Sequence, residues 1–231
     1  TDDGDYVLPL QAVIAERLLK MLSREKQELL LHLFCAIATA LAPYVNRRTT
    51  IARTPEARLA ARLFSAEKVV RPLLGHHASE FYGKTKEAWQ WNARYWEQRA
   101  ILTQSENIDT AIQYARHAVA IEEHPFPWTT LAALQTKKLE TLSSGFNLLF
   151  DELYETLFQV FRHEANARAW RTTPHSYLTL FNATNIFLDK GGRLPPRKQD
   201  WIKTQIEKAR TLFTRDTALL DTAELVRKKI G

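Results

Sequence analysis

Few side chains in this 231-residue chain have the types and spacings that carry chemistry. The single cysteine, Cys35, and the seven histidines show neither the H-x3-H nor the C-x2-C spacing from which zinc sites are built. Cys35 and His32 are three residues apart, so a helix would place the thiol beside a base. They lie in the apolar run LLLHLFCAIATAL, where burial raises a thiol pKa and limits access to it. The sequence therefore argues against both a metal site and a cysteine nucleophile.

Glycine loops that bind nucleotides are also missing from the sequence. It contains no G-x-x-x-x-G-K-[ST] phosphate loop and no G-x-G-x-x-G pattern. No set of acid, base and nucleophile stands out either. We therefore predict that this chain is not an enzyme and uses no cofactor, although a longer parent protein could hydrolyse a nucleotide elsewhere.

An aromatic group followed by arginines is the most suggestive cluster for binding, because Trp, Tyr and Arg make most binding hot spots. The group consists of Trp89, Trp91, Tyr95 and Trp96, with Arg94 and Arg99 nearby. One interpretation is a protein anchor. The favoured interpretation is a hydrophobic core where amino-terminal helices meet the helices that follow.

A basic segment, 47–71, carries almost all of the excess charge. Seven Lys and Arg against two Glu give it +5 of the chain's net +6. The candidate basic patch comprises Arg47, Arg48, Arg53, Arg58 and Arg62. Three interpretations stay open: a solvated helix face, a contact with another domain or an acidic protein, and phosphate contacts with nucleic acid. Nucleic acid is the less favoured partner, because the segment has few aromatic residues for stacking and no recognition-helix motif.

The elements that would position these residues are helices. Apolar spacing predicts a helix opened by Pro9 and another that includes 29–41, with Ser23 as its N-cap. Thr54-Pro55-Glu56 is a helix start, and Ser65 begins a short helix that ends near Gly75. Further helices are expected at 78–89, 92–104, 108–122, 127–142, 147–169, 174–189, 196–213 and 217–229. No stretch alternates long enough for a strand, so the predicted fold class is all-α.

Small residues recur between Tyr95 and Pro125 in a way that suits a helical hairpin. Close packing of two helices needs short side chains at their contact, and Ala100, Ala111, Ala115 and Ala118 provide them. With Tyr95 opening the first helix and Asn107-Ile108-Asp109 at the turn, the segment resembles a tetratricopeptide repeat.

The next segment resembles the opening of a second, degenerate repeat. Trp128, Leu131, Ala132 and Gln135 are similar to the W-x2-L-G-x2-Y pattern, with Ala for Gly and Gln for Tyr. The departures are Arg99 at a small position of the first repeat and a second partner helix, FNLLFDELYETLFQVF, that is lined with large apolar residues.

The resemblance implies antiparallel helical hairpins stacked as a short TPR-like solenoid of about ten to twelve helices. Residues 1–90 would form an amino-terminal helical segment, and 91–231 would form the repeat region. In such repeats the first helix of each hairpin lines the groove. The candidate protein-binding residues are therefore Tyr95, Gln98, Arg99, Trp128 and Gln135.

Longer stretches are similar to the carboxy-terminal helical region of bacterial STAND-type NTPases, several of which act in antiviral defence. They are ALAPYV…RTPEARLAARLF, WQWNARYWEQRAI, YARHAVAIEEHPFPWTTLA and RAWRTTPHSYLTLF. In that family a nucleotide-binding engine and an effector precede a repeat array that senses a foreign protein. The resemblance implies a sensor module whose partner is a protein, either a foreign (phage) protein or a neighbouring domain of the parent chain.

Location and processing are predicted from the ends and the cysteine content. A lone cysteine allows no disulfide within the chain and indicates a reducing compartment, so a cytoplasmic location is expected. The apolar stretch 29–45 is interrupted by polar and helix-breaking residues and is about one turn short of a bilayer span, so we expect a core helix and no membrane contact. No signal peptide is expected, and a chain that starts at Thr1 is either processed or a fragment.

Overall fold

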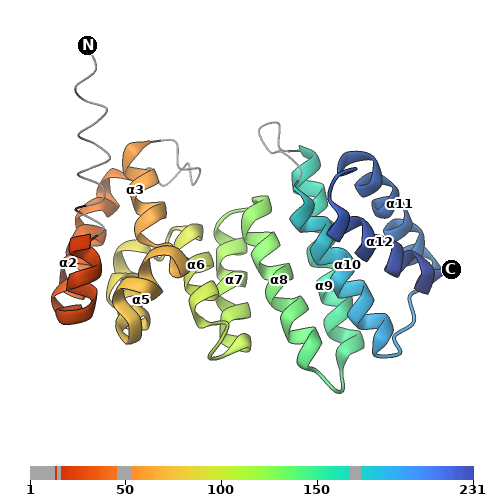
Figure 1. Ribbon diagram of the computed structural model, residues 1–231, viewed down its shortest axis with the longest axis horizontal. Helices are drawn as coiled ribbons and strands as arrows, with labels where there is room; N and C mark the ends of the chain where they lie inside the picture. Colours follow the sequence, from red (N-terminus) through yellow and green to blue (C-terminus); the bar gives the residue numbers. More distant parts are fainter. Residues whose placement is uncertain (1–13, 15–16, 46–53, 167–172) are drawn as a thin grey trace, which may run out of the picture. The chain divides into compact units, whose positions relative to one another are not determined.

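The computed structural model describes residues 14, 17–45, 54–166 and 173–231. Throughout these ranges the secondary structure is helical and contains no strand (Figure 1), which confirms the all-α fold class. The chain divides into two compact units, Thr1–Glu122 and Glu123–Gly231. The predicted boundary at 90/91 falls inside the first unit, because Tyr95 and Trp96 belong to the same core as Phe64 and Trp89.

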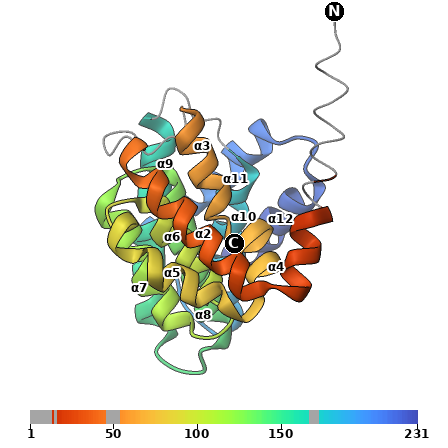
Figure 2. The same ribbon diagram turned by 90° about the vertical axis from the view of Figure 1, so that its left-hand side faces the viewer.

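The helices of the first unit follow the predicted order. They comprise a helix over 17–25, α2 (Gln27–Leu41), a 3-10 turn (Ala42–Tyr44), α3 (Pro55–Leu63), a π-helical turn (Ala66–Val70), α4 (Arg71–Leu74), a 3-10 turn (Gly75–His77), α5 (Ala78–Trp89), α6 (Ala93–Thr103) and α7 (Ile108–Ile121). Figure 2 shows α2, α3 and α5 on the side that faces the viewer.

Capping side chains set several of these starts. Thr54 accepts a hydrogen bond from the Ala57 N–H at 3.2 Å, and Asn107 accepts one from the Thr110 N–H at 2.9 Å. Each bond satisfies a backbone donor that the first helical turn leaves without a partner. The prediction for Ser23 is wrong: it lies within the helix over 17–25, where its hydroxyl donates to the Lys20 carbonyl at 2.8 Å.

The segment after α3 differs from the single short helix expected between Ser65 and Gly75. The Ser65 carbonyl accepts from the N–H groups of both Val69 and Val70, which creates the π-helical turn. Pro72 lacks an N–H and so cannot continue that bonding pattern. Gly75 follows at φ +52°, a left-handed value that favours glycine.

The core of the first unit is centred on the ring of Phe64. Its centroid lies 4.8 Å from that of Trp89, 5.3 Å from that of Phe81 and 5.6 Å from that of Tyr95. The Trp89 indole N–H donates to the Ala38 carbonyl of α2 at 2.9 Å. The favoured interpretation of the aromatic cluster as core is therefore confirmed.

Helix α2 packs with only one of its faces. That face is made by Leu30, Leu31, Phe34 and Ala38. Leu29, Leu33 and Ile37 are exposed on the other side. By length and composition alone, Gln27–Tyr44 would be sufficient to cross a membrane, a test that core helices of soluble proteins also pass.

The alanines that suggested a hairpin are buried. Helices α6 and α7 pack against each other across a four-residue connection, so they run antiparallel. Ala100, Ala111, Ala115 and Ala118 have no exposed surface. Small residues at these contacts let the two helix backbones approach closely, as the spacing predicted.

The second unit contains α8 (Pro125–Thr141), α9 (Phe146–Asn166), α10 (Pro174–Asp189), α11 (Pro196–Leu212) and α12 (Thr217–Ile230). Helices α8 and α9 pack as a pair, and α10 packs against α8, α9 and α12. In its core the ring of Phe150 stacks on that of Phe187 at 4.0 Å. All predicted helices from 78 onward begin within two residues of the expected position.

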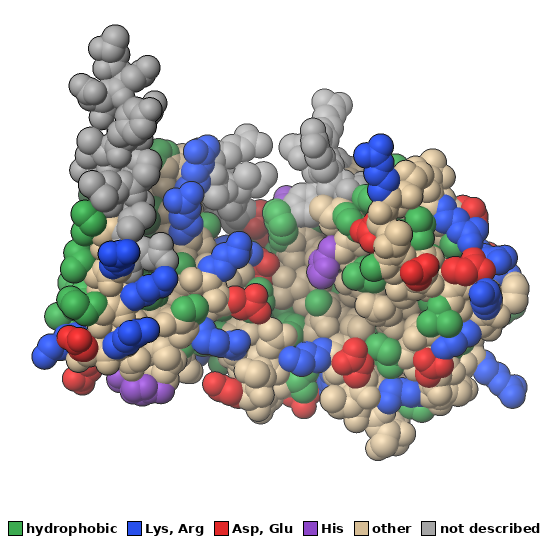
Figure 3. Space-filling model, in the orientation of Figure 1, with side chains coloured by type: hydrophobic (Ala, Val, Ile, Leu, Met, Phe, Trp, Pro, Cys, Tyr) green, Lys and Arg blue, Asp and Glu red, His purple; other side chains and the backbone are tan. Residues whose placement is uncertain are grey.

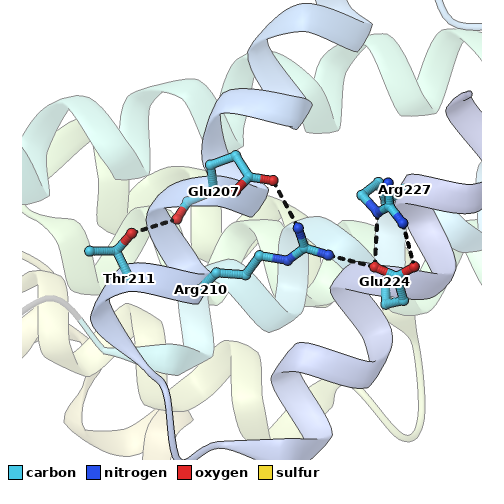
Figure 4. A network of polar contacts seen from close by, with 5 residues as sticks. All are labelled: Glu207, Arg210, Thr211, Glu224 and Arg227. Carbon is cyan, nitrogen blue, oxygen red and sulfur yellow. Dashed lines mark hydrogen bonds and ion pairs between the residues drawn. The ribbon is translucent and has the colours of Figure 1, made fainter.

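A polar network joins α11 to α12 (Figure 4). Arg210 donates to Glu207 at 3.0 Å and to Glu224 at 2.5 Å, and Arg227 donates to both oxygens of Glu224. These bonds, led by that from Arg227, lower the pKa of Glu224 to about 2. The bond from Arg210 links the two helices, and the bidentate bonds from Arg227, which lies on α12 with Glu224, hold the shared carboxylate in place.

The carboxyl of Glu122, the residue after α7, lies in an unfavourable environment for a charge. Burial and the nearby charge of Glu97 raise the pKa of Glu122 from 4.5 to about 7. A carboxyl with a raised pKa binds its proton more tightly in the folded state than in the unfolded chain. Its contribution to stability is therefore complete below pH 4.5 and is lost as the pH rises to about 7.

We expect Glu122→Gln to remove the loss of stability that the ionisation of Glu122 causes as the pH rises. At pH 8 the variant should be more stable than the parent by about 1–2 kcal/mol, a value reduced because solvent screens a half-buried group. At pH 5 the difference should be small. Urea denaturation at both pH values measures it, with the exposed Glu123→Gln as the control. A difference that does not grow between pH 5 and pH 8 would contradict this account.

Candidate functional site

Two of the five predicted protein-binding residues are core residues of the first unit. Tyr95 is fully buried, and its hydroxyl donates to the Tyr82 carbonyl. Burial raises the pKa of Tyr95 to about 12. Gln98 is buried too, and its side-chain oxygen accepts from the Ala66 N–H at 2.9 Å. The prediction that Tyr95 and Gln98 face a binding surface is therefore wrong, because their polar groups complete backbone hydrogen bonding inside the unit.

The remaining three residues are held by neighbouring side chains. The Arg99 guanidinium lies 4.5 Å from the centre of the Tyr114 ring, a cation–π contact. Trp128 is half-buried and stacks on His163. Gln135 is fully buried and donates to Glu152 at 2.9 Å, so the prediction of a surface position is wrong for it as well.

The candidate basic patch is only partly within the described residues. Arg58 and Arg62 lie on α3 with exposed side chains. Arg47, Arg48 and Arg53 lie outside the described residues. Figure 3 shows Lys and Arg side chains gathered around α3 on the face drawn there.

The side chains considered for metal or thiol chemistry have structural surroundings. Burial raises the pKa of the Cys35 thiol, and the His32 ring bonds to the Glu28 carbonyl of its own helix at 2.7 Å. In the described ranges no group of three His, Cys, Asp or Glu side chains could hold a metal ion.

The second unit contains a cleft that the sequence did not reveal. It has a volume of about 340 Å³. We call it the aromatic cleft; it is lined by Phe158, Phe161, Arg162, Glu164, Ala165, Tyr177, Trp201, Gln205 and Lys208.

Helical spacing brings these residues together. From α9, Phe158, Phe161 and Arg162 recur at the three- and four-residue intervals of one helix face. Trp201 and Gln205 are related in the same way on α11, and the rings of Phe161 and Trp201 meet edge to face at 5.6 Å. Aromatic pairs with this geometry are stable, so the walls are preformed.

The floor of the cleft is polar and almost completely buried. Tyr177, Glu164 and Gln205 are 3%, 6% and 4% exposed. Glu164 accepts a hydrogen bond from the Ser176 hydroxyl at 2.5 Å. Burial and the Glu164 charge raise the pKa of Tyr177, which keeps its hydroxyl neutral.

The side-chain amide of Gln205 faces the cleft. Within the described ranges its side-chain amide makes no hydrogen bond, although it lines the cleft. Although the residue as a whole is 4% exposed, its amide is not among the fully buried groups without a partner, so it reaches the solvent of the cleft. Gln205 is therefore positioned to bond a group that enters the cleft.

The rim carries two cations on different helices. Arg162 of α9 and Lys208 of α11 are exposed, and neither has an ion-pair partner in the part of the chain that the structure describes. Phe158, which is 41% exposed, adds an apolar surface beside them. Exposed aromatic and Arg side chains around a concavity are the composition of a binding site.

The amino-acid sequence contains only a weak signal for this site. The sequence pattern predicts Phe161 only as part of the apolar lining of a repeat helix and does not single out Phe158. Trp201 stands alone in the polar stretch PRKQDWIKTQIEKARTL, where a large aromatic residue has no neighbours of its kind. That isolation is the feature that would have drawn attention to α11, but it does not identify which helix supplies the opposite wall.

Comparisons with known proteins identify no relative: no protein-family model, no curated protein and no solved structure matches this chain.

Proposed function

We propose that this chain is a protein-recognition module that binds an extended segment of a partner protein in the aromatic cleft. The observation that carries the proposal is the unbonded Gln205 amide on the floor of a cleft walled by aromatic rings. An amide both donates and accepts, which matches the N–H and C=O of a peptide backbone. The aromatic walls would hold the side chain next to that peptide group.

The proposed architecture remains a TPR-like array, with α6/α7 and α8/α9 as consecutive hairpins. What supports it is the close packing within each pair and the buried alanines of the first. Recognition uses α9, α10 and α11 in this proposal, because the expected groove residues Tyr95, Gln98 and Gln135 are buried.

The parent protein that we propose is a STAND-type signalling NTPase of the cytoplasm, in which this chain is the sensor and performs no catalysis. The support is the resemblance of the four sequence stretches described above. In that arrangement the partner would be a foreign protein or a neighbouring domain, and no membrane would take part.

The test is a selection of peptides on the 231-residue chain from a random 16-residue display library. Selected peptides should bind the parent, and Gln205→Leu should weaken them about tenfold or more, because the leucine offers the backbone no hydrogen bond. The same variant should unfold at about the same urea concentration as the unmutated chain, since it breaks no hydrogen bond within the described residues.

Two further variants locate the binding. Phe158→Ala should weaken the selected peptides at least fivefold, because it removes an apolar side chain at the rim. Leu148→Ala, on the same helix but 79% exposed and outside the cleft, is the matched control and should leave affinity unchanged. The proposal would be refuted if the selected peptides bound Gln205→Leu and Phe158→Ala as tightly as the unmutated chain, or if the selection enriched no peptide.

The alternative function is nucleic-acid binding through the basic segment. The exposed side chains of Arg58 and Arg62 and the Lys and Arg around α3 favour it. Affinity for duplex or single-stranded oligonucleotides should then fall steeply as salt rises. Absence of binding at low salt would exclude this alternative.

A further inference from the structure

We infer that the aromatic cleft selects a peptide segment in which a large apolar side chain stands next to an acidic residue. The inference rests on the proposed function and adds the chemistry of the partner. Two observations carry it: the aromatic lining of the cleft and the state of the charged groups around it.

The apolar part of the motif follows from the walls. The rings of Phe158, Phe161 and Trp201 form a connected group, with centroids 5.6–6.0 Å apart for the pairs that include Trp201. A volume of about 340 Å³ lies at the lower end of the range for ligand pockets. It suits one large side chain with the adjacent backbone rather than a whole folded surface.

The acidic part follows from a contrast among neighbouring cations. Lys198 is paired with Asp151 at 2.6 Å and lies over the Tyr154 ring, and Arg210 is paired with both Glu207 and Glu224. Arg162 and Lys208 have no such partner in the described ranges. Both cations on the rim of the cleft are thus available to pair with a ligand.

The buried carboxylate of the floor does not reverse this preference. Glu164 lines the cleft but is only 6% exposed, and one of its oxygens accepts from the Ser176 hydroxyl, so little of the carboxylate is open to a ligand. A cationic ligand in the cleft would lie near Arg162 and Lys208, which both line it, and like charges repel. A carboxylate would instead gain two charge-assisted contacts, one of them with a guanidinium that can bind both of its oxygens.

The experiment reverses the charge of the rim. The peptide selection is run on the parent and on the double variant R162E/K208E, and the binding of each selected peptide is measured with its acidic position changed to Asn and to Lys. Selection on the unmutated chain should enrich peptides with Asp or Glu beside the apolar residue. The unmutated chain should bind a peptide with Lys at that acidic position about tenfold more weakly. The double variant should prefer the Lys form.

A matched control separates a local from a general charge effect. Lys137→Glu with Arg193→Glu changes the net charge equally at exposed positions outside the cleft. This control should keep the preference of the parent. Circular dichroism and urea midpoints check that each double variant is folded.

The outcomes distinguish this inference from the proposed function. Peptides that depend on Phe158 and Gln205 but ignore the rim charges would overturn the acidic preference and leave protein recognition standing. The same holds if the preference of R162E/K208E equals that of the parent. Peptides that depend on neither Phe158 nor Gln205 would overturn both.

Discussion

Replacing Trp89 by alanine should lower the free energy of unfolding by about 3–5 kcal/mol. Trp89 is 1% exposed and its ring meets Phe64 edge to face at 4.8 Å. Alanine would leave a cavity at the centre of the first unit. It would also remove the donor to the Ala38 carbonyl, which lies on α2, fifty-one positions earlier in the chain.

Two variants separate the cost of the lost apolar volume from the cost of the lost hydrogen bond. Trp89→Phe keeps most of the apolar volume but loses the hydrogen bond, so its cost should be smaller than that of alanine. Trp91→Ala is the comparison for a tryptophan whose indole bonds locally: it is half-buried and its N–H donates to the Ala88 carbonyl, three residues back. Its cost should be about 1–2 kcal/mol.

Urea denaturation followed by far-UV circular dichroism measures these differences. A larger loss for Trp91→Ala than for Trp89→Ala would show that the first unit is not organised around the Phe64 and Trp89 rings.

Introducing tryptophan at Ala118 should destabilise the α6/α7 hairpin by about 1–3 kcal/mol or more. Ala118 has no exposed surface and belongs to the core of the first unit. A bulky ring there would force the two helices apart, and the packing lost would include contacts of Trp96 and Tyr114, whose rings lie 5.5 Å apart. Ala111→Trp should behave similarly, since that side chain is also fully buried.

The control is Ala120→Trp on the same helix. Ala120 is exposed, so tryptophan there should change the unfolding free energy by less than about 0.5 kcal/mol. Melting of all three variants like the parent would show that the alanines do not hold the hairpin together.

Much of the helical pattern was predictable because its signals are local. Thr54, Asn107 and the prolines at 125, 174 and 196 sit at helix starts, where a cap or a fixed φ acts within one turn. Ser23 shows the limit of such signals. The same hydroxyl that can cap a helix donates instead to the carbonyl three residues back, so the preceding helix continues through it.

Side-chain exposure was harder to predict, because a repeat pattern fixes the face of a helix but not what packs against it. Gln98 illustrates this point. A glutamine in a first helix suggests a groove, but the π-helical turn at 66–70 places an N–H against it and buries it. The core of the first unit likewise includes residues on both sides of the predicted boundary at 90/91, since Tyr95 joins a core built from earlier residues.

The amino-acid sequence by itself determined the all-α class, most helix starts and the buried alanines of the hairpin, because periodicity and capping act over a few residues. Only the tertiary structure decided which polar groups form hydrogen bonds inside their unit and which, like the Gln205 amide, face a cleft without one. It also decided that Arg162 and Lys208 share one rim. Those properties depend on distances between α9, α10 and α11. Contacts between side chains that are forty or more residues apart in the sequence do not appear in its local periodicity, so the sequence pattern could not predict them.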